Sequence, residues 1–372
     1  MKEILRTEEM EGEECLRLRG LWEGVFQEDS EAFTDYYFEK KAARNHAFAL
    51  RNGQEYVSML YLSPYPMMLR TGEQFVCREI YYIVGVATKK EYRHRGYMDR
   101  LLKEALAFVR AKGQPFAFLM PADQRIYTPY QFSYIYDREI YRLKEEKAGK
   151  SSLGIHSFTE EEFHALAVCA SSFLEKHYDV FIQRDSLYYR GMERELEVQN
   201  GGICLISGKG KDAEGYFFYA EEEGKGEILE AVLPKGDSGS LVYNTGKKQP
   251  AIMGRIADVK SMLSLMRAKE EEVSWSLLVK DPILKENEGI WRCRMTSGEA
   301  FIDKEEKGVL ERNGTPSEYE CQAEIDQLAA WAFGYREAEE CFLFPDDADR
   351  EAVLCKLQGI RRLCRVFINE IV

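Results

Sequence analysis

The chain has 372 residues, of which 64 are Asp or Glu and 51 are Lys or Arg, giving a formal net charge of −13. This length is too large for one average hydrophobic core and predicts two or three domains. The negative charge excludes a general nucleic-acid-binding role, which needs a basic surface. It favours cationic partners such as amines, although ordinary solubility explains it equally well.

Cysteine usage and the lack of apolar runs predict a cytoplasmic protein. The first 14 residues are charged and contain no apolar signal core. No apolar run approaches the ~18 residues of a membrane span. Nine cysteines, an odd number without a C-x-x-C pair, predict buried free thiols in a reducing compartment. The five histidines show no metal-ligand spacing. We therefore expect no metal site, no nucleic acid and no membrane among its partners.

The first part of the chain alternates between helix and strand patterns, which is typical of an α+β domain. Ser30 is a suitable N-cap for a helix over residues 30–43. Asn52-Gly53 separates two apolar runs and predicts a β-hairpin, because both residues tolerate a positive φ angle. Apolar residues recur at the helical period over residues 96–112. The other predicted elements are a helix over residues 11–28 and strands over residues 67–75, 78–88 and 115–121.

Two further units follow a polar segment over residues 145–154, which predicts a linker. In the second unit Thr159 and Glu162 form a capping box, and three strands follow its helices, which repeats the order of the first unit. The third unit begins near residue 250 with a strand and ends with a short apolar tail. Its other predicted elements are helices over residues 261–271 and 323–336 and strands through SWSLLV and GIWRCRM.

A basic turn joins the strand over residues 78–88 to the helix that begins after Gly96. A helix N-terminus carries unpaired backbone N–H groups and a partial positive charge, which suit pyrophosphate. Glycine lets the backbone approach a ligand, and arginines add charge-assisted hydrogen bonds. The alternative is a solvated turn with a packing glycine. The candidate residues for binding a phosphate-bearing cofactor are Val86, Ala87, Thr88, Arg93, His94, Arg95, Gly96, Tyr97 and Met98.

This stretch resembles the coenzyme A signature of the GNAT acetyltransferases, R-x-x-G-x-G/A, preceded by a strand that ends five residues before the arginine. Here the signature is RHRGYM over residues 93–98, and Thr88 lies five residues before Arg93. Met98 replaces the usual small residue, but its backbone N–H can still point at a phosphate. The resemblance implies acetyl-CoA as co-substrate, no metal, and pantetheine pairing with the strand end at Val86 and Thr88.

A second landmark of the GNAT proteins is a tyrosine after the next strand, in a Y-x-x-x-G-F pattern. The matching text is YTPYQF over residues 127–132, with Gln131 in place of the glycine. Acetyl transfer expels a thiolate with a pKa of about 8.5, and a tyrosine with a pKa of about 10 can protonate it. The resemblance thus implies Tyr127 as the general acid. Tyr130 or Tyr134 takes the role if the turn is shifted, and a core-filling tyrosine is the structural alternative.

The whole architecture resembles the enhanced intracellular survival (Eis) type. In this type a GNAT domain is followed by a degenerate GNAT-like domain and a sterol-carrier-protein-like domain. Residues 253–263 and 367–372 resemble the start and the terminus of that third domain. The resemblance implies that the α-carboxylate of Val372 is the base. The predicted fold is α+β, with mostly antiparallel sheets, divided into a catalytic domain (1–144), a degenerate domain (145–249) and a sterol-carrier-protein-like domain (250–372).

These observations predict an N-acetyltransferase that transfers acetyl directly from acetyl-CoA to a primary amine. The expected acceptor is a small cation, aminoglycoside-like or polyamine-like. Two alternatives stay open: a lipid-binding or carrier protein that uses the third domain, and a coenzyme A-binding scaffold without catalytic activity. Members of the Eis type are often oligomeric and some are hexameric, so the resemblance also allows a homo-oligomer.

Overall fold

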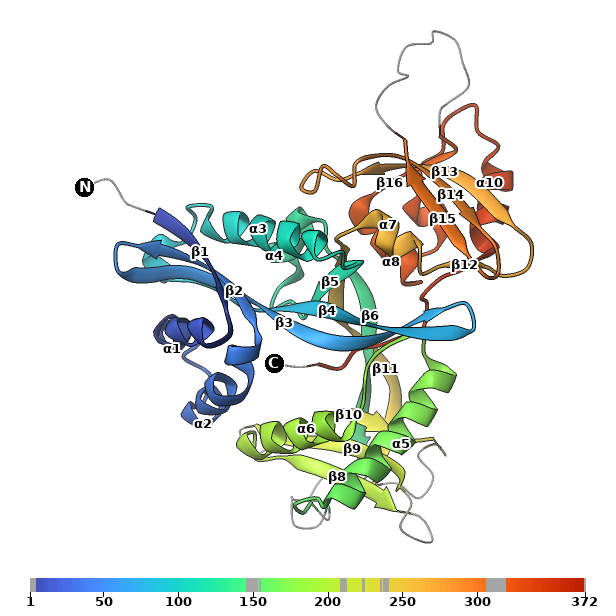
Figure 1. Ribbon diagram of the computed structural model, residues 1–372. Coiled ribbons are helices and arrows are strands. Elements are labelled where there is room, and N and C mark those ends of the chain that lie inside the picture. The colour runs from blue at the N-terminus through green and yellow to red at the C-terminus, as the bar shows by residue number, and fades with distance from the viewer. Residues whose placement is uncertain are drawn as a thin grey trace.

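Helices and strands alternate along the chain (Figure 1) in a computed structural model that describes residues 5–144, 153, 155–207, 213–222, 225–234, 236, 241–305 and 319–370. The strands are β1 (Leu5–Glu11), β2 (His46–Asn52), β3 (Glu55–Thr71), β4 (Gln74–Thr88), β5 (Phe116–Leu119), β6 (Ser133–Leu143), β7 (Val180–Ile182), β8 (Gly202–Ser207), β9 (Ala213–Glu222), β10 (Lys225–Val232), β11 (Val242–Ile256), β12 (Arg267–Ala268), β13 (Val273–Lys280), β14 (Gly289–Met295), β15 (Ala300–Lys304), β16 (Cys321–Glu324), β17 (Ile360–Arg361) and β18 (Val366–Phe367). The α-helices are α1 (Arg19–Val25), α2 (Glu31–Tyr36), α3 (Tyr97–Ala111), α4 (Gln124–Tyr127), α5 (Glu160–His177), α6 (Ser186–Val198), α7 (Val259–Leu263), α8 (Ile325–Ala332), α9 (Ala338–Cys341) and α10 (Arg350–Gln358). Short 3₁₀ and π segments are η1 (Gly12–Leu18), η2 (Tyr37–Lys41), η3 (Ala42–Arg44), η4 (Lys90–Tyr92) and η5 (Thr128–Tyr130).

One sheet of 12 strands runs through the first two units. Its main path is β1-β2-β3-β4-β5-β11-β6-β10-β9-β8, and β7 pairs with β3 beside this path. Most neighbours are antiparallel, whereas β4–β5 and β7–β18 are parallel. Helix α3 covers one face of the first part of the sheet, and α1 and α2 lie on the other face (Figure 1). The predicted α+β class with mostly antiparallel strands is therefore confirmed.

Strand β11 connects all three units. Its residues pair with β6 from Val242 to Gly254 and with β5 from Met253 to Ile256. The predicted boundary between residues 249 and 250 thus falls inside one continuous strand. The predicted linker lies mostly outside the described residues, because residues 145–152 and 154 are not among them. The division into three domains at these positions stays a prediction.

The third unit has a sheet of its own, in the order β15-β14-β13-β16, with β13 and β16 parallel. Its buried side chains form one hydrophobic cluster with those of the first unit, in which Phe116 packs edge-on against Phe333 at 4.9 Å between ring centres. The second unit has a separate core, which takes Phe367 from the C-terminal segment. The C-terminal segment therefore contributes to the core of the second unit, which is distant from it in sequence.

The C-terminal segment, residues 364–370, leaves the third unit and returns to the large sheet (Figure 1). Its strand β18 pairs in parallel with β7, at Val366–Val180 and Phe367–Phe181. Asp179 anchors the start of the segment, because it pairs with Arg365 at 2.7 Å and with Arg70 at 2.9 Å. Docking of its apolar residues is what the sequence pattern predicted.

Several local predictions are confirmed and one helix ends earlier than predicted. Ser30 accepts a hydrogen bond from the Phe33 N–H at 3.1 Å, and Thr159 and Glu162 form the reciprocal capping box. The helix predicted over residues 11–28 corresponds to the 3₁₀ segment η1 and the short helix α1, which together cover residues 12–25, while residue 11 ends β1. The helix predicted over residues 261–271 stops at Leu263, because the chain turns into β12, which pairs with β17.

The cysteines are all unpaired thiols, as predicted, but Cys77, Cys355 and Cys364 are exposed, so the prediction of burial is wrong for these three. In the described part of the chain, no helix is both long enough and apolar enough to cross a membrane. The same residues contain no group of three or more His, Cys, Asp or Glu side chains placed to hold a metal ion.

Candidate functional site

Strands β4 and β5 separate after one short stretch of pairing. They pair at Tyr81–Ala117 and at Tyr82–Phe118, and β4 then continues to Thr88 with β3 as its partner. A bulge at Gly85, with φ of +61°, bends this continuation. Only glycine fits there, since a Cβ atom would lie 2.5 Å from the Trp22 ring. The edge of β4 beyond Tyr82 is thus left for another pairing partner.

The basic turn lies directly beyond this strand end. Arg93, His94, Arg95 and Gly96 are exposed, and His94 and Gly96 have positive φ angles of 61° and 77°. Arg93 Nε donates to the Thr88 carbonyl at 3.1 Å, which ties the turn to the strand. The first backbone bond of α3 runs from Arg100 N to the Gly96 carbonyl at 3.1 Å. The amides before it have no partner within the helix, which makes this turn suitable for an anion.

Tyr127 ends α4 and is buried beside the point where β4 and β5 separate. Burial raises the pKa of its hydroxyl to about 12. Its electrostatic neighbour is Tyr82, whose pKa is raised by burial, then by the charge of Glu370, and also by Tyr127. Tyr82 stacks on Phe118 at 4.9 Å between ring centres, so the last paired residues of the two strands fix its position.

The other two candidate tyrosines face different surroundings. Tyr130 lies next to Asp99 in the first turn of α3, and burial followed by this carboxylate raises the pKa of its hydroxyl. Tyr134 packs against Tyr335 of the third unit, at 6.2 Å between ring centres. Among the three, Tyr127 is the one whose hydroxyl interacts with Tyr82, at the end of the paired region.

The C-terminal segment reaches the same point. The Glu370 carbonyl accepts a hydrogen bond from the Tyr82 hydroxyl at 3.5 Å. The Glu370 carboxylate is buried and contacts Arg184 Nη1 at 3.3 Å and the Tyr188 hydroxyl at 3.0 Å. Burial raises its pKa to about 7, against the opposing effect of the Arg184 charge. Val372, the predicted base, lies outside the described residues, which end at Glu370.

Buried polar groups support Arg184 in turn. Its Nη2 pairs with Glu230 at 2.9 Å, and Glu230 accepts a hydrogen bond from the Tyr216 hydroxyl at 2.7 Å. Burial by itself would lower the pKa of Arg184, but the charges of Glu230 and Glu370 outweigh it and the pKa is raised. The guanidinium therefore stays positive, and the second unit holds the C-terminal segment through a fixed charge.

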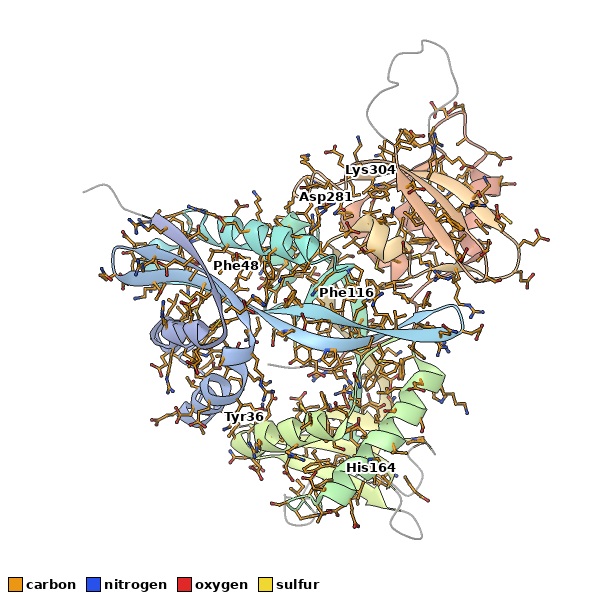
Figure 2. The ribbon with its side chains drawn as sticks, in the orientation of Figure 1. Tyr36, Phe48, Phe116, His164, Asp281 and Lys304 are labelled. Carbon is orange, nitrogen blue, oxygen red and sulfur yellow. The ribbon has the colours of Figure 1, made fainter. Side chains whose placement is uncertain are left out.

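A cavity of about 410 Å³ adjoins Glu370. Residues between 36 and 45 of the first unit form one wall, and residues between 182 and 195 of the second unit form the other. Ser63 in its lining is the β3 partner of Tyr82, so the cavity reaches the point where β4 and β5 separate. Tyr36 lies where α2 meets α6 (Figure 2), and its hydroxyl donates to the Gly191 carbonyl at 3.2 Å.

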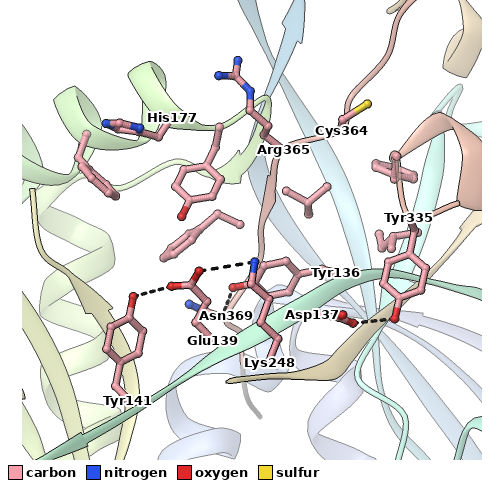
Figure 3. Close-up of a pocket in the computed structure, with 17 residues that line it drawn as sticks. Tyr136, Asp137, Glu139, Tyr141, His177, Lys248, Tyr335, Cys364, Arg365 and Asn369 are labelled. Atoms are coloured by element: carbon pink, nitrogen blue, oxygen red, sulfur yellow. Dashed lines mark hydrogen bonds and ion pairs between the residues drawn. The ribbon is translucent and has the colours of Figure 1, made fainter. Parts of the chain in front are cut away.

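A second cavity, of about 420 Å³, lies at the junction of the three units and is lined by the same C-terminal segment (Figure 3). Here the Tyr136 hydroxyl donates to Asn369 Oδ1 at 2.8 Å, and Tyr335 donates to Asp137 at 2.6 Å. The first contact holds Asn369 against β6, and the second ties the third unit to the same strand. Residue 370, next to Asn369, enters the first cavity, so both cavities meet at this segment.

The sequence pointed to the basic turn and to Tyr127, but it did not point to three other parts of the candidate site. It did not identify Tyr82, Glu370 or the cavity between α2 and α6. A glycine inside the apolar run EIYYIVGVA was a signal for the bulge. No local pattern pointed to Glu370, because its environment comes from Arg184 and Tyr82, 186 and 288 positions away along the chain.

Comparisons with known proteins agree with this geometry. Residues 6–135 match the family model of the acetyltransferase (GNAT) domain, and residues 259–344 match that of the sterol carrier protein domain. No curated protein matches the sequence.

Solved structures match over 99% of this chain and 100% of their own. They include a GCN5-related N-acetyltransferase from Anabaena variabilis (18% identity, TM-score 0.72) and a probable N-acyltransferase from Enterococcus faecalis (18%, 0.70). Eis1 from Mycobacterium abscessus is 11% identical, with a TM-score of 0.68. At these identities the likeness establishes the fold.

The first unit is therefore a GNAT acetyltransferase domain, and the third contains a sterol carrier protein domain. The protein thus carries an acetyltransferase domain, and this domain supports acyl transfer as its general chemistry.

Proposed function

We propose that this protein is an acetyl-CoA-dependent N-acetyltransferase of the Eis type, acting on a primary amine of a small molecule. The amine enters as an ammonium ion through the cavity beside Glu370 and attacks the thioester directly. The observation that carries the proposal is the meeting of three elements at Tyr82: the end of β4–β5 pairing, Tyr127 on α4, and the C-terminal segment at Glu370.

In this proposal the cofactor lies along the end of β4 and on the basic turn. Its pantetheine pairs with the β4 edge, where Val86 and Thr88, two residues apart, present backbone groups in the same direction. Its pyrophosphate accepts hydrogen bonds from backbone N–H groups and from the exposed arginines. The residues proposed to hold acetyl-CoA are Val86, Ala87, Thr88, Arg93, His94, Arg95, Gly96, Tyr97 and Met98.

The chemistry needs a base for the ammonium proton and an acid for the departing thiolate. The Val372 carboxylate is the proposed base, as the Eis resemblance implies, and the approach of the described segment to Tyr82 supports it. The nitrogen then bonds to the acetyl carbon, the carbon–sulfur bond breaks, and Tyr127 donates its proton to sulfur while the nitrogen releases its second proton to solvent. Exchange with solvent restores both groups, leaving an amide and a free thiol. Apolar surroundings raise the pKa of the coenzyme A thiol as they raise that of the Tyr127 hydroxyl. The two pKa values therefore stay close enough for proton transfer.

A panel of primary amines with acetyl-CoA tests this proposal, with the free thiol as the measured product. We expect turnover with at least one amine. In Tyr127→Phe, kcat should fall about a hundredfold, while the KM for acetyl-CoA is unchanged. A Tyr127→Phe variant with the wild-type rate would remove the acid from the proposal.

Binding of acetyl-CoA is tested by a matched pair of substitutions at Gly96. Both Gly96→Ala and Gly96→Glu add a Cβ atom at φ of +77°, where open space surrounds it. Each should lower the unfolding free energy by about 1 kcal/mol. Only the glutamate places a negative charge at the proposed pyrophosphate site. Acetyl-CoA should therefore raise the melting temperature of Gly96→Ala but not that of Gly96→Glu, and equal shifts would contradict the placement.

The lipid-carrier alternative has less support. A cavity on the sheet of the third unit is lined largely by polar and charged side chains, among them Ser276, Arg292, Arg294, Asp303 and Glu320. Such a lining does not suit an apolar ligand. A coenzyme A-binding scaffold would bind acetyl-CoA and acetylate no amine, which the panel distinguishes.

A further inference from the structure

The cavity between α2 and α6 has more positive than negative side chains. Five of its lining residues are Lys or Arg, and three are Asp or Glu. Five of these eight already have ion-pair partners. Lys41 and Glu195 pair with each other at 2.7 Å. The other three pair with residues outside the lining: Lys40 with Glu39 at 3.7 Å, Arg190 with Glu160 at 2.5 Å and Glu370 with Arg184 at 3.3 Å. The net positive character of the cavity is thus opposite to the net charge of −13 of the whole chain.

Two carboxylates of the lining are buried, whereas two of its arginines are exposed. Glu370 and Glu195 are 5% and 3% exposed; Glu370 lies beside Tyr82, and Glu195 lies beside Tyr36 and pairs with Lys41. Arg44 and Arg194 are exposed and lie at the opening, one in each wall. Within the part of the chain that the structure describes, neither arginine is paired with a carboxylate. The cavity therefore combines two buried carboxylates with two exposed arginines.

Arg44 and Arg194 line the same cavity, and both act on Tyr36. Burial and the Glu195 carboxylate raise the pKa of its hydroxyl, while the positive charges of Arg44 and Arg194 act in the opposite direction. Both cations thus act on one hydroxyl, between α2 and α6 (Figure 2). They are also separate from the cofactor turn, because α2 and α3 lie on opposite faces of the sheet (Figure 1).

We infer that the acceptor is an amine that also carries an anionic group, a carboxylate or a phosphate. The ammonium end lies at the buried carboxylate of Glu370, and the anionic end is held at the opening by Arg44 and Arg194. This inference rests on the proposed acetyltransferase function and narrows its substrate class. A polycation such as a polyamine would place positive charge against the two arginines, which costs free energy.

Matched acceptor pairs test the inference. We would compare 2-aminoethyl phosphate with ethanolamine, and β-alanine with its amide, and include spermidine as a polycation. The anionic member of at least one pair should have a kcat/KM about tenfold higher, mainly through a lower KM. The pair that responds identifies the anion as phosphate or carboxylate. Equal or better use of ethanolamine, the amide and spermidine would overturn the inference.

Substitutions at the opening locate the effect. Arg44→Gln and Arg194→Gln should each raise the KM for the preferred anionic acceptor about fivefold, without changing the KM for its neutral counterpart or for acetyl-CoA. Arg350→Gln, an exposed arginine on α10 in the third unit, removes the same charge away from the cavity and should change neither. If the Arg44→Gln, Arg194→Gln double variant still prefers the anionic member of the pair, the two arginines do not bind the anionic group.

Binding without turnover separates this inference from the proposed function. Calorimetric titration of 2-aminoethyl phosphate and of β-alanine, without acetyl-CoA, should detect binding of at least one to the wild-type protein and none to the Arg44→Gln, Arg194→Gln double variant. The binding should weaken with added salt. Failure to acetylate any amine would refute the proposed function, whereas failure to bind either ligand would refute the anion site.

Discussion

Replacing Glu370 with glutamine tests the burial of the C-terminal segment. Burial raises the pKa of this carboxyl from its ordinary 4.5 to about 7. A carboxyl whose pKa is higher in the folded state binds a proton more tightly there. Its stabilising contribution is thus complete below pH 4.5 and is lost as the pH rises through 7.

The two pKa values set the size of the effect. With 4.5 for the unfolded and about 7 for the folded state, ionisation of Glu370 removes on the order of 2 kcal/mol of unfolding free energy between pH 5 and pH 8. Glutamine has nearly the same shape and does not ionise. The unfolding free energy of Glu370→Gln relative to wild type should therefore rise by a similar amount over this range.

Urea unfolding of both proteins at several pH values between 5 and 8 measures this difference. Glu197→Gln, an exposed carboxylate on α6, controls for the loss of one negative charge. Parallel stability curves for wild type and Glu370→Gln would mean that Glu370 ionises as in water, and the described position of the C-terminal segment would then be incorrect.

Two other perturbations test neighbouring parts of the site. Gly85→Ala places a Cβ atom 2.5 Å from the buried Trp22 ring at a positive φ angle. The substitution should therefore lower the unfolding free energy by about 2 kcal/mol and raise the KM for acetyl-CoA. Unchanged stability would show that β4 has no bulge at Gly85. Deletion of Ile371 and Val372 should lower kcat about a hundredfold while acetyl-CoA still raises the melting temperature, whereas an unaffected rate would exclude the terminal carboxylate as the base.

Local chemistry made part of the molecule predictable. Ser30 and Thr159 cap helices with hydrogen bonds that span three residues, and Asn52-Gly53 closes a hairpin between adjacent strands. The basic turn is also local, because the first amides of any helix lack partners within that helix, wherever the helix begins. Such features depend on neighbours in the sequence, so periodicity and turn residues are enough to find them.

Pairing with distant strands set the bounds of two predicted helices. The helix predicted over residues 11–28 begins one residue later, because Glu11 belongs to β1 and pairs with His46 of β2. The helix predicted after residue 261 ends early because Arg267 and Ala268 pair with β17 near the end of the chain. In both cases hydrogen bonds to a distant strand decide the local conformation.

By itself the sequence determined the α+β class and the basic turn before the helix that begins after Gly96. The resemblance of this turn to the coenzyme A signature pointed to acetyl transfer. Only the tertiary structure joined the first two units into one sheet and placed Glu370 against Tyr82 and Arg184. It also placed Arg44 and Arg194 in the lining of one cavity, and from this we infer an acceptor that carries an anionic group. Net charge is a sum over all residues, whereas a ligand responds to the few charges that folding brings around it.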